Sequence, residues 1–255
     1  MWTDAAPSSF PLHGFLLVLA RVAGLFAMVP IPGARSLAEP ARIWFVCALS
    51  LSLAPLWPPV RLQSAGQMAL WLVSELGLGL AVGLVAGFVA ETLVFGAQAV
   101  ALQAGFSYAS TIDPGSQADS SVLQLLSQLA ANLLFFTSGL DHAAVRAVAR
   151  SLEAFPPGAV WNGWVWLDAV QAGGAAMMEL GLRLALPVAG LLLLADLTLA
   201  LASRLQAQLQ LLSMAFPLKM LMALAVLAAI APLTVWIHRA AAGGAIAALR
   251  QWGLN

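Results

Sequence analysis

The sequence has few charged residues. Only 9% of its 255 residues are charged, whereas 62% are hydrophobic. Soluble domains carry a charge on about a quarter of their residues, so this chain has too little polar surface to cover a soluble globule of its size. The composition therefore predicts an integral membrane protein.

The sequence also has a single cysteine and no excess of positive charge. Lys and Arg balance Asp and Glu at 11 each, which gives no basic surface for a nucleic acid. Cys47 is the one cysteine, so neither an internal disulfide nor a cysteine-based metal site is predicted, and we interpret it as a small buried apolar residue. The first residues include Asp4 but no Lys or Arg, unlike a signal peptide, so we expect the first apolar segment to remain as an anchor.

Catalytic patterns are equally scarce. The sequence has 3 histidines, and neither an HExxH nor a Gly-x-Ser-x-Gly pattern nor a nucleotide-binding loop occurs. Asp141 and His142 form an isolated dyad in a polar stretch. We predict a protein that is not an enzyme and has no cofactor or metal. A membrane-embedded hydrolase would rest on this dyad alone.

Long apolar runs dominate what is present. A bilayer core takes about 20 apolar residues as a helix. The sequence predicts an all-α protein with about six hydrophobic segments, which we place in a single helical membrane domain over 1–255. Trp161, Trp164 and Trp166 lie before the fifth segment, as aromatic residues do at a membrane interface. The segments are 10–29, 43–56, 68–104, 122–140, 175–202 and 217–237.

Two of these segments have unusual lengths. The second is short for a span and is also compatible with a buried or re-entrant piece. The third contains no proline and would extend about 55 Å as one helix, beyond the thickness of a bilayer. We expect it to tilt sharply, to project from the membrane, or to be broken at Gly87 or Gly96.

Small residues recur on the third segment. Gly79, Gly83 and Gly87 are spaced four apart and form one smooth stripe on a helix. This spacing lets a second helix approach closely, which is how helices associate in lipid. Helix packing is favoured over chance spacing in a glycine-rich helix.

Ionisable residues interrupt the apolar segments. Such groups are expensive at membrane depth and should face protein or water. Glu179 and Arg183 are four apart and can pair on one helix face. The set is compatible with a proton or ion path or with packing against neighbouring subunits, and we favour packing because the charges are scattered without a repeated motif. The residues are Arg21, Glu75, Glu91, Glu179, Arg183, Asp196 and Lys219.

A polar interval, 105–121, separates two of the apolar segments. It is rich in glycine and serine, has two aspartates and contains no Lys or Arg. Asp113-Pro114-Gly115 has the chemistry of a turn. At membrane depth such irregular backbone is tolerated only against protein or a water-filled cavity. The interval is therefore either an exposed connector or a thin, adaptable segment that fills a narrow lumen.

Several blocks, in this order, resemble the FliR family. The first joins Leu19-Ala20-Arg21 to Pro30 and Gly33-Ala34-Arg35-Ser36. The second is Gly105-x-Ser107-x-Ala109-x-x-x-Asp113-Pro114. The third runs from Leu186-Pro187 through Asp196 and Ser203-Arg204 to Phe216-Pro217-Leu218-Lys219.

The chain also departs from the family pattern. It has Ala207-Gln208 where the family has a Pro-Gln pair, and Asp141-His142 in place of Asn-Gly-His. Glu39-Pro40 adds an acidic residue to the first basic link. These departures bear on local geometry.

The resemblance implies a structural pore subunit of the bacterial flagellar type III export gate. Such a subunit would combine P-like and Q-like helical hairpins in a helical hetero-oligomer, in the inner membrane within the flagellar basal body. Its partners would be FliP-type and FliQ-type subunits, FlhB-type and FlhA-type export proteins, and unfolded exported proteins. The interval 105–121 would be the pore plug, and its residues would include Gly105, Ser107, Ala109, Asp113, Pro114, Gly115 and Ser116.

Two other functions stay open. The virulence counterpart of the family is the T subunit of injectisome export systems. A small secondary transporter or channel would need inverted repeats and broken helices around a ligand, and no convincing internal repeat is present.

Overall fold

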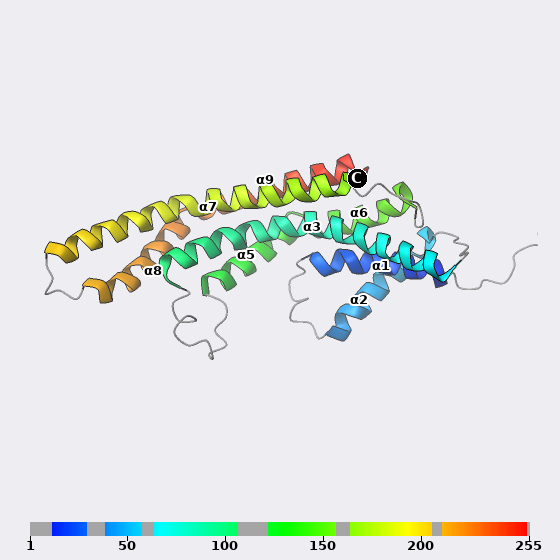
Figure 1. The fold of residues 1–255 in the computed structure, drawn as a ribbon, viewed down its shortest axis with the longest axis horizontal. Coiled ribbons are helices and arrows are strands. Elements are labelled where there is room, and N and C mark those ends of the chain that lie inside the picture. The colour runs from blue at the N-terminus through cyan, green and yellow to red at the C-terminus, as the bar shows by residue number, and fades with distance from the viewer. Residues whose placement is uncertain are drawn as a thin grey trace, which may run out of the picture. The chain divides into compact units, whose positions relative to one another are not determined.

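The computed structural model describes residues 12–29, 39–57, 64–106, 122–156, 164–205 and 211–253. Within these ranges the protein is all-helical, without a strand (Figure 1). This confirms the predicted fold class. Of the loop residues named above, Gly105 falls within the described ranges, whereas Ser107, Ala109, Asp113, Pro114, Gly115 and Ser116 lie outside them.

The chain divides into two compact units, each built from several stretches of sequence. Unit 1 comprises Met1–Gly87, Gly139–Gly173 and Gly244–Asn255. Unit 2 comprises Phe88–Ser138 and Gly174–Gly243.

Unit 1 is organised around α1 (Leu12–Met28). This helix packs against α2 (Glu39–Ser52) and α6 (Leu140–Ala154), and a short 3-10 turn, η1 (Ala54–Leu56), follows α2. Phe26 of α1 stacks edge-on against Phe45 of α2, and its carbonyl accepts a hydrogen bond from Arg42. Apolar side chains facing inward from α1, such as Leu17 and Val22, form the centre of this unit.

Trp166 belongs to the interior of unit 1. It is 4% exposed, and its ring lies 5.3 Å from that of Phe155 and 4.1 Å from that of Trp252. The ring of Trp166 is therefore packed against protein, and its position at a membrane interface stays a prediction. Trp161 lies outside the described residues.

The third apolar segment forms one unbroken helix, α3 (Ala65–Ala104), of 40 residues. It continues through both Gly87 and Gly96, so the expectation of a break at either glycine is not met. At 1.5 Å per residue the helix extends about 60 Å, and it contributes its first part to unit 1 and its second part to unit 2.

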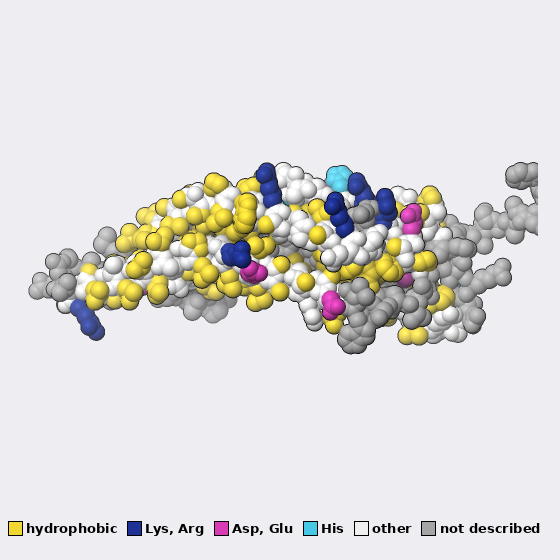
Figure 2. Space-filling model, turned by 90° about the horizontal axis from the view of Figure 1, so that it is seen from above, with side chains coloured by type: hydrophobic (Ala, Val, Ile, Leu, Met, Phe, Trp, Pro, Cys, Tyr) yellow, Lys and Arg dark blue, Asp and Glu magenta, His cyan; other side chains and the backbone are white. Residues whose placement is uncertain are grey.

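Unit 2 contains α5 (Val122–Thr137) and α8 (Leu211–Ala229) together with most of α7 (Trp164–Leu205) and part of α9 (Ala231–Gln251). Apolar side chains of α7 such as Leu186 and Leu201 remain more than 60% exposed, as expected of a helix that contacts lipid or another protein. Figure 2 shows one face of the molecule, where hydrophobic side chains are widespread and charged ones are few.

Within the described part of the chain, two helices are long and apolar enough to cross a membrane, and the number rises to four if each of two bent pairs is one span. The pairs are α5 with α6, bent by 60°, and α8 with α9, bent by 61°. Gly139 adopts a left-handed conformation between α5 and α6, and Pro232 at the start of α9 cannot donate the bond that would extend α8. About six hydrophobic segments were predicted, and the described parts of the first two form α1 and α2, apolar helices of 17 and 14 residues.

Candidate functional site

The start of the polar interval is fixed by a complete helix-ending motif. Gly105 has φ +86°, which a glycine adopts without steric cost. Its N–H bonds to the carbonyl of Leu102 at 3.3 Å, and the N–H of Phe106 bonds to the carbonyl of Ala101 at 3.0 Å. These two bonds and the left-handed glycine constitute a Schellman motif, which ends α3 and turns the chain away from the helix axis.

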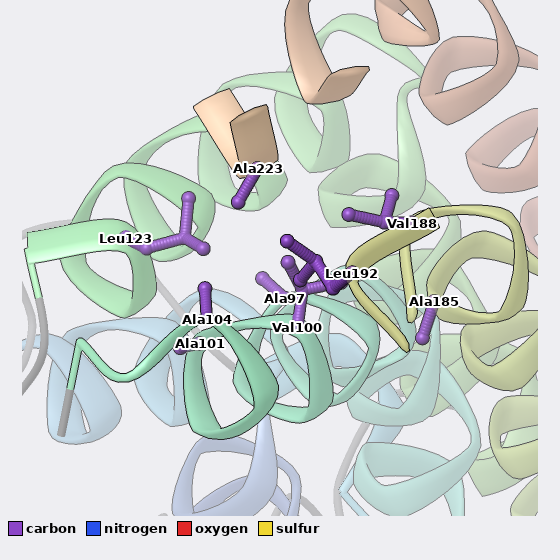
Figure 3. Close-up of a cluster of buried hydrophobic side chains, with 9 residues drawn as sticks. All are labelled: Ala97, Val100, Ala101, Ala104, Leu123, Ala185, Val188, Leu192 and Ala223. Atoms are coloured by element: carbon purple, nitrogen blue, oxygen red, sulfur yellow. The ribbon is translucent and has the colours of Figure 1, made fainter. Parts of the chain in front are cut away.

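One buried cluster, here called the anchor cluster, holds both ends of the interval (Figure 3). Ala101 and Ala104 come from the last turns of α3, and Leu123 comes from the first turn of α5. Phe106 packs against the same cluster. Phe106 and Leu123, on either side of residues 107–121, therefore pack in the same core of unit 2. The remaining members come from α3, α7 and α8: Ala97, Val100, Ala185, Val188, Leu192 and Ala223.

A buried ion pair joins the helices of unit 1. The Nε of Arg21 donates to Oε2 of Glu75 at 2.6 Å, and both side chains are almost fully buried. Nη1 donates to Oγ of Ser151 at 3.0 Å, and Nη2 donates to the carbonyl of Phe155 at 2.9 Å. A buried charge is tolerable when it is paired and its other donors are satisfied, as they are here. The network ties α1 to α3 and to α6.

Two further ion pairs lie in unit 2. Nζ of Lys219 on α8 lies 2.9 Å and 3.0 Å from the two carboxylate oxygens of Asp196 on α7. Arg183 and Glu179 pair at 2.6 Å along α7, with both side chains about 60% exposed. The pairing of Glu179 with Arg183 is as the spacing suggested. Glu91 lies half-buried in α3.

Two of the three glycines in the predicted stripe lie at a helix contact. A Cβ on Gly79 would come within 1.9 Å of the carbonyl oxygen of Arg21, and one on Gly83 within 2.6 Å of that of Leu25. Gly24 of α1 faces α3 in the same way, since a Cβ there would lie 2.4 Å from the carbonyl oxygen of Leu76. Gly87 is buried in the same helix. In unit 1, α1 and α3 therefore touch backbone to backbone, as small residues permit.

His238 is a buried polar residue that the sequence pattern did not reveal. It lies in α9 and is 1% exposed. Its Nε2 is 3.4 Å from Oγ of Ser138, and its Nδ1 has no hydrogen-bond partner among the described residues. Its neighbour Arg239 is exposed, so the inward direction of His238 depends on the packing of α9 against the end of α5.

The Asp141–His142 dyad lies on the surface of unit 1. Nδ1 of His142 is 3.0 Å from Oδ1 of Asp141, and the histidine side chain is 81% exposed. Both residues belong to the first turn of α6, where a carboxylate stabilises the helix N-terminus. Among the described residues no group of three His, Cys, Asp or Glu side chains could hold a metal ion.

Comparison with known proteins identifies the family. The model of "Bacterial export proteins, family 1" matches residues 12–243. The chain belongs to this family. The match includes α1, the end of α3, α5 and the ion pairs described above.

Three relatives illustrate the likeness, each a flagellar biosynthetic protein FliR. The protein of Escherichia coli (strain K12) is 29% identical over 87% of this chain and 85% of its own length. That of Bacillus subtilis (strain 168) is 26% identical over 80% of this chain and 81% of its own length. That of Aquifex aeolicus (strain VF5) is 22% identical over 90% of each. The likeness to the FliR family inferred from sequence blocks is confirmed, and the protein is an integral membrane protein of this family.

Proposed function

We propose that this protein is a structural subunit of the bacterial flagellar type III protein export gate, required for export of flagellar proteins and assembly of the flagellum. The observation that carries the proposal is the family match over residues 12–243, together with relatives that align along most of their length under the name FliR. The proposed place of work is the inner membrane within the flagellar basal body.

The state of the charged residues supports a structural role over an ion path. A proton relay needs carboxylates that can exchange protons with water. Glu75 is instead buried against Arg21. Asp196 is paired with Lys219, although its side chain stays 40% exposed. These two pairs join α1 to α3 and α7 to α8, which supports a packing role for them.

The proposal includes no catalysis. The Asp141–His142 dyad occupies the exposed first turn of a helix, where both side chains have an ordinary structural explanation. The proposal also includes the prediction, made from the sequence, that the protein has neither a metal nor a cofactor.

The loop 105–121 is proposed as the plug that closes the pore at rest. Its small residues suit a narrow lumen, and the absence of Lys and Arg removes the bulkiest flexible charges. The anchor cluster supports this role, because a segment fastened at Phe106 and Leu123 to one core can leave the lumen without detaching from the subunit. Ser107, Ala109, Asp113, Pro114, Gly115 and Ser116 are the residues proposed to occupy the pore.

The proposed partners are FliP-type and FliQ-type subunits, with FlhB-type and FlhA-type export proteins and unfolded substrates. Exposed apolar surface on α7, such as Leu186 and Leu201, is available for such neighbours as well as for lipid. The relatives named above carry a flagellar name, which favours the flagellar gate over the injectisome.

Co-purification tests the proposal. The chain, tagged and expressed in the bacterium that encodes it, is extracted in a mild detergent and its companions are identified by mass spectrometry. FliP-type and FliQ-type subunits at fixed ratios are expected. A control strain lacks the FliP-type subunit, and the remaining complex should then dissociate. Recovery of the tagged chain as a stable homo-oligomer with transport activity would contradict the proposal.

A further inference from the structure

The ion pair between α7 and α8 lies directly beside the anchor cluster. Asp196 follows the cluster member Leu192 by one helical turn on α7, and Lys219 precedes the cluster member Ala223 by one turn on α8. Residues four apart lie on the same face of a helix. Figure 3 shows the side chains of Leu192 and Ala223 directed into the same cluster. The pair therefore extends the contact between α7 and α8 one turn beyond the cluster.

The two partners of this pair differ in exposure. Nζ of Lys219 lies 2.9 Å and 3.0 Å from the two carboxylate oxygens of Asp196, so one ammonium bridges both oxygens. The Lys219 side chain is 13% exposed, whereas that of Asp196 is 40% exposed. A largely buried ammonium is unfavourable without a counter-charge. Lys219 is therefore stable in this position only where it meets Asp196, and the pair fixes the position of α8 along α7.

The position of α8 in turn affects how the ends of the interval 105–121 are packed. α8 supplies Ala223 to the anchor cluster, and Met222 and Val226 pack against it. Phe106 and Leu123, on either side of residues 107–121, pack in that same cluster. Protein interiors are close-packed, so moving one wall opens space beside the others. A displacement of α8 is therefore expected to loosen both ends.

We propose that the Lys219–Asp196 pair is a latch that positions α8 and thereby holds both ends of the interval in the anchor cluster. Lys219 and Asp196 are positioning residues, since they act on the ends of the interval through Ala223 and Leu192. All of these residues belong to unit 2. The consequence for a closed pore rests on the proposed plug, whereas the hold on the two ends is a property of the described helices.

Hydrogen exchange in the full-length protein, purified with its bound subunits, tests the latch. The amides of Gly105 and Phe106 report on the first end, because both donate to carbonyls of the last turns of α3. The amides of the second turn of α5 report on the other end. In the Asp196→Asn variant the ammonium of Lys219 loses its counter-charge, so both ends are expected to exchange about fivefold faster than in the parent.

A variant with the charges exchanged separates the pair from its individual side chains. Lys219→Asp combined with Asp196→Lys restores an ion pair between α7 and α8. Exchange at both ends should then return to within about twofold of the parent rate, because the two substitutions compensate each other. If Asp196→Asn yields too little protein, Lys219→Gln, which leaves only the more exposed carboxylate unpaired, is measured by the same criteria.

The matched control is Glu179→Gln. It also removes one carboxylate from an ion pair of α7, but the Glu179–Arg183 pair lies along a single helix and joins no second one. Exchange at both ends of the interval should equal that of the parent. The amides of residues 175–180 of α7, in the same unit and before its cluster members, are the internal reference and should keep the parent rate in Asp196→Asn.

Three outcomes would overturn the latch. Both ends could exchange at the parent rate in Asp196→Asn, or the reference amides could speed up equally, which would mean a general loss of stability. The variant with the charges exchanged could also stay as fast as Asp196→Asn. Faster exchange at both ends without a leak of small solutes into cells that carry Asp196→Asn would support the latch and contradict the proposed plug.

Discussion

At the scale of single residues, the guanidinium of Arg21 is the group whose environment is most demanding. It is buried, and its charge is balanced by Glu75, with Ser151 and Phe155 accepting its remaining bonds. Such a pair adds little over a well-packed apolar pair, but removing one partner leaves an uncompensated buried charge. The network is therefore a point where one substitution affects three helices.

We expect Glu75→Gln to lower the free energy of unfolding by about 3 kcal/mol, because Arg21 then remains charged and buried. Thermal unfolding of the purified protein in detergent would measure this as a lower midpoint. Glu179→Gln is the matched control, since the Glu179–Arg183 pair lies along one helix, is not enclosed by this protein and joins no two helices. A Glu75→Gln midpoint equal to that of the control would refute the structural role of the buried pair. Arg21→Met combined with Glu75→Leu should recover much of the loss.

The ion pairs show what local sequence could and could not reveal. Glu179 and Arg183 are neighbours on one helix face, so their spacing was enough to suggest the pair. Arg21 and Glu75 are 54 residues apart, and Lys219 and Asp196 are 23 apart and on different helices. Their partners are determined by how the helices pack, and the sequence could say only that each charge needs one.

At the scale of elements, the contact between α1 and α3 depends on missing side chains. Gly79→Ala would place a Cβ within 1.9 Å of a backbone oxygen of α1, so the helices must separate. We expect a loss of about 3 kcal/mol, as for severe overpacking, and a several-fold lower level of protein in the membrane. Immunoblotting of membranes and thermal unfolding would measure both. Gly190→Ala, where space is open, should change neither; equal losses in the two variants would refute the contact.

The end of α3 depends on the conformation of Gly105. An L-residue with a side chain resists a φ of +86°, so Gly105→Val should destabilise the Schellman motif by about 1 to 2 kcal/mol. Gly105→Asn should cost less, since asparagine tolerates this region better. Amide hydrogen exchange of the last turn of α3 would show faster exchange in the valine variant. Equal exchange in the valine and asparagine variants would mean that the motif does not control the helix end.

Helix ends were harder to predict than helices. The long apolar runs of α3 and α7 were enough to predict that both are helices, because few other structures can cross a lipid bilayer. The predicted segment 122–140 ends close to Gly139, which lies between α5 and α6, although an isolated glycine is by itself equally compatible with a continuous helix. The sequence analysis described the residues around Asp141 and His142 only as a polar stretch. In the structure they begin α6, which buries Ala144, Ala147 and Val148 on one face.

At the scale of the whole molecule, the family could be predicted from the sequence because its sequence motifs occur in a fixed order along most of the chain. The site could be predicted only in part. The polar composition of 105–121 was enough to single out the interval. The sequence did not show that its two ends pack together, because that depends on Leu123 and Ala104 meeting in one core. The single-domain description, the partners and the plug remain predictions.

Deleting Gly115–Asp119 tests the plug in the intact cell. The deletion shortens the interval between Phe106 and Leu123 without removing either anchor, so the subunit should still fold and assemble. A shortened loop would fill the lumen incompletely, and cells expressing the variant should admit small solutes that the parent excludes. Dye uptake and growth inhibition by small solutes measure the leak, with co-purified subunits as the check on assembly. The control replaces the same five residues by serine and glycine, which keeps the length and should keep the seal. An assembled deletion variant with the permeability of the parent would show that the loop does not close the pore.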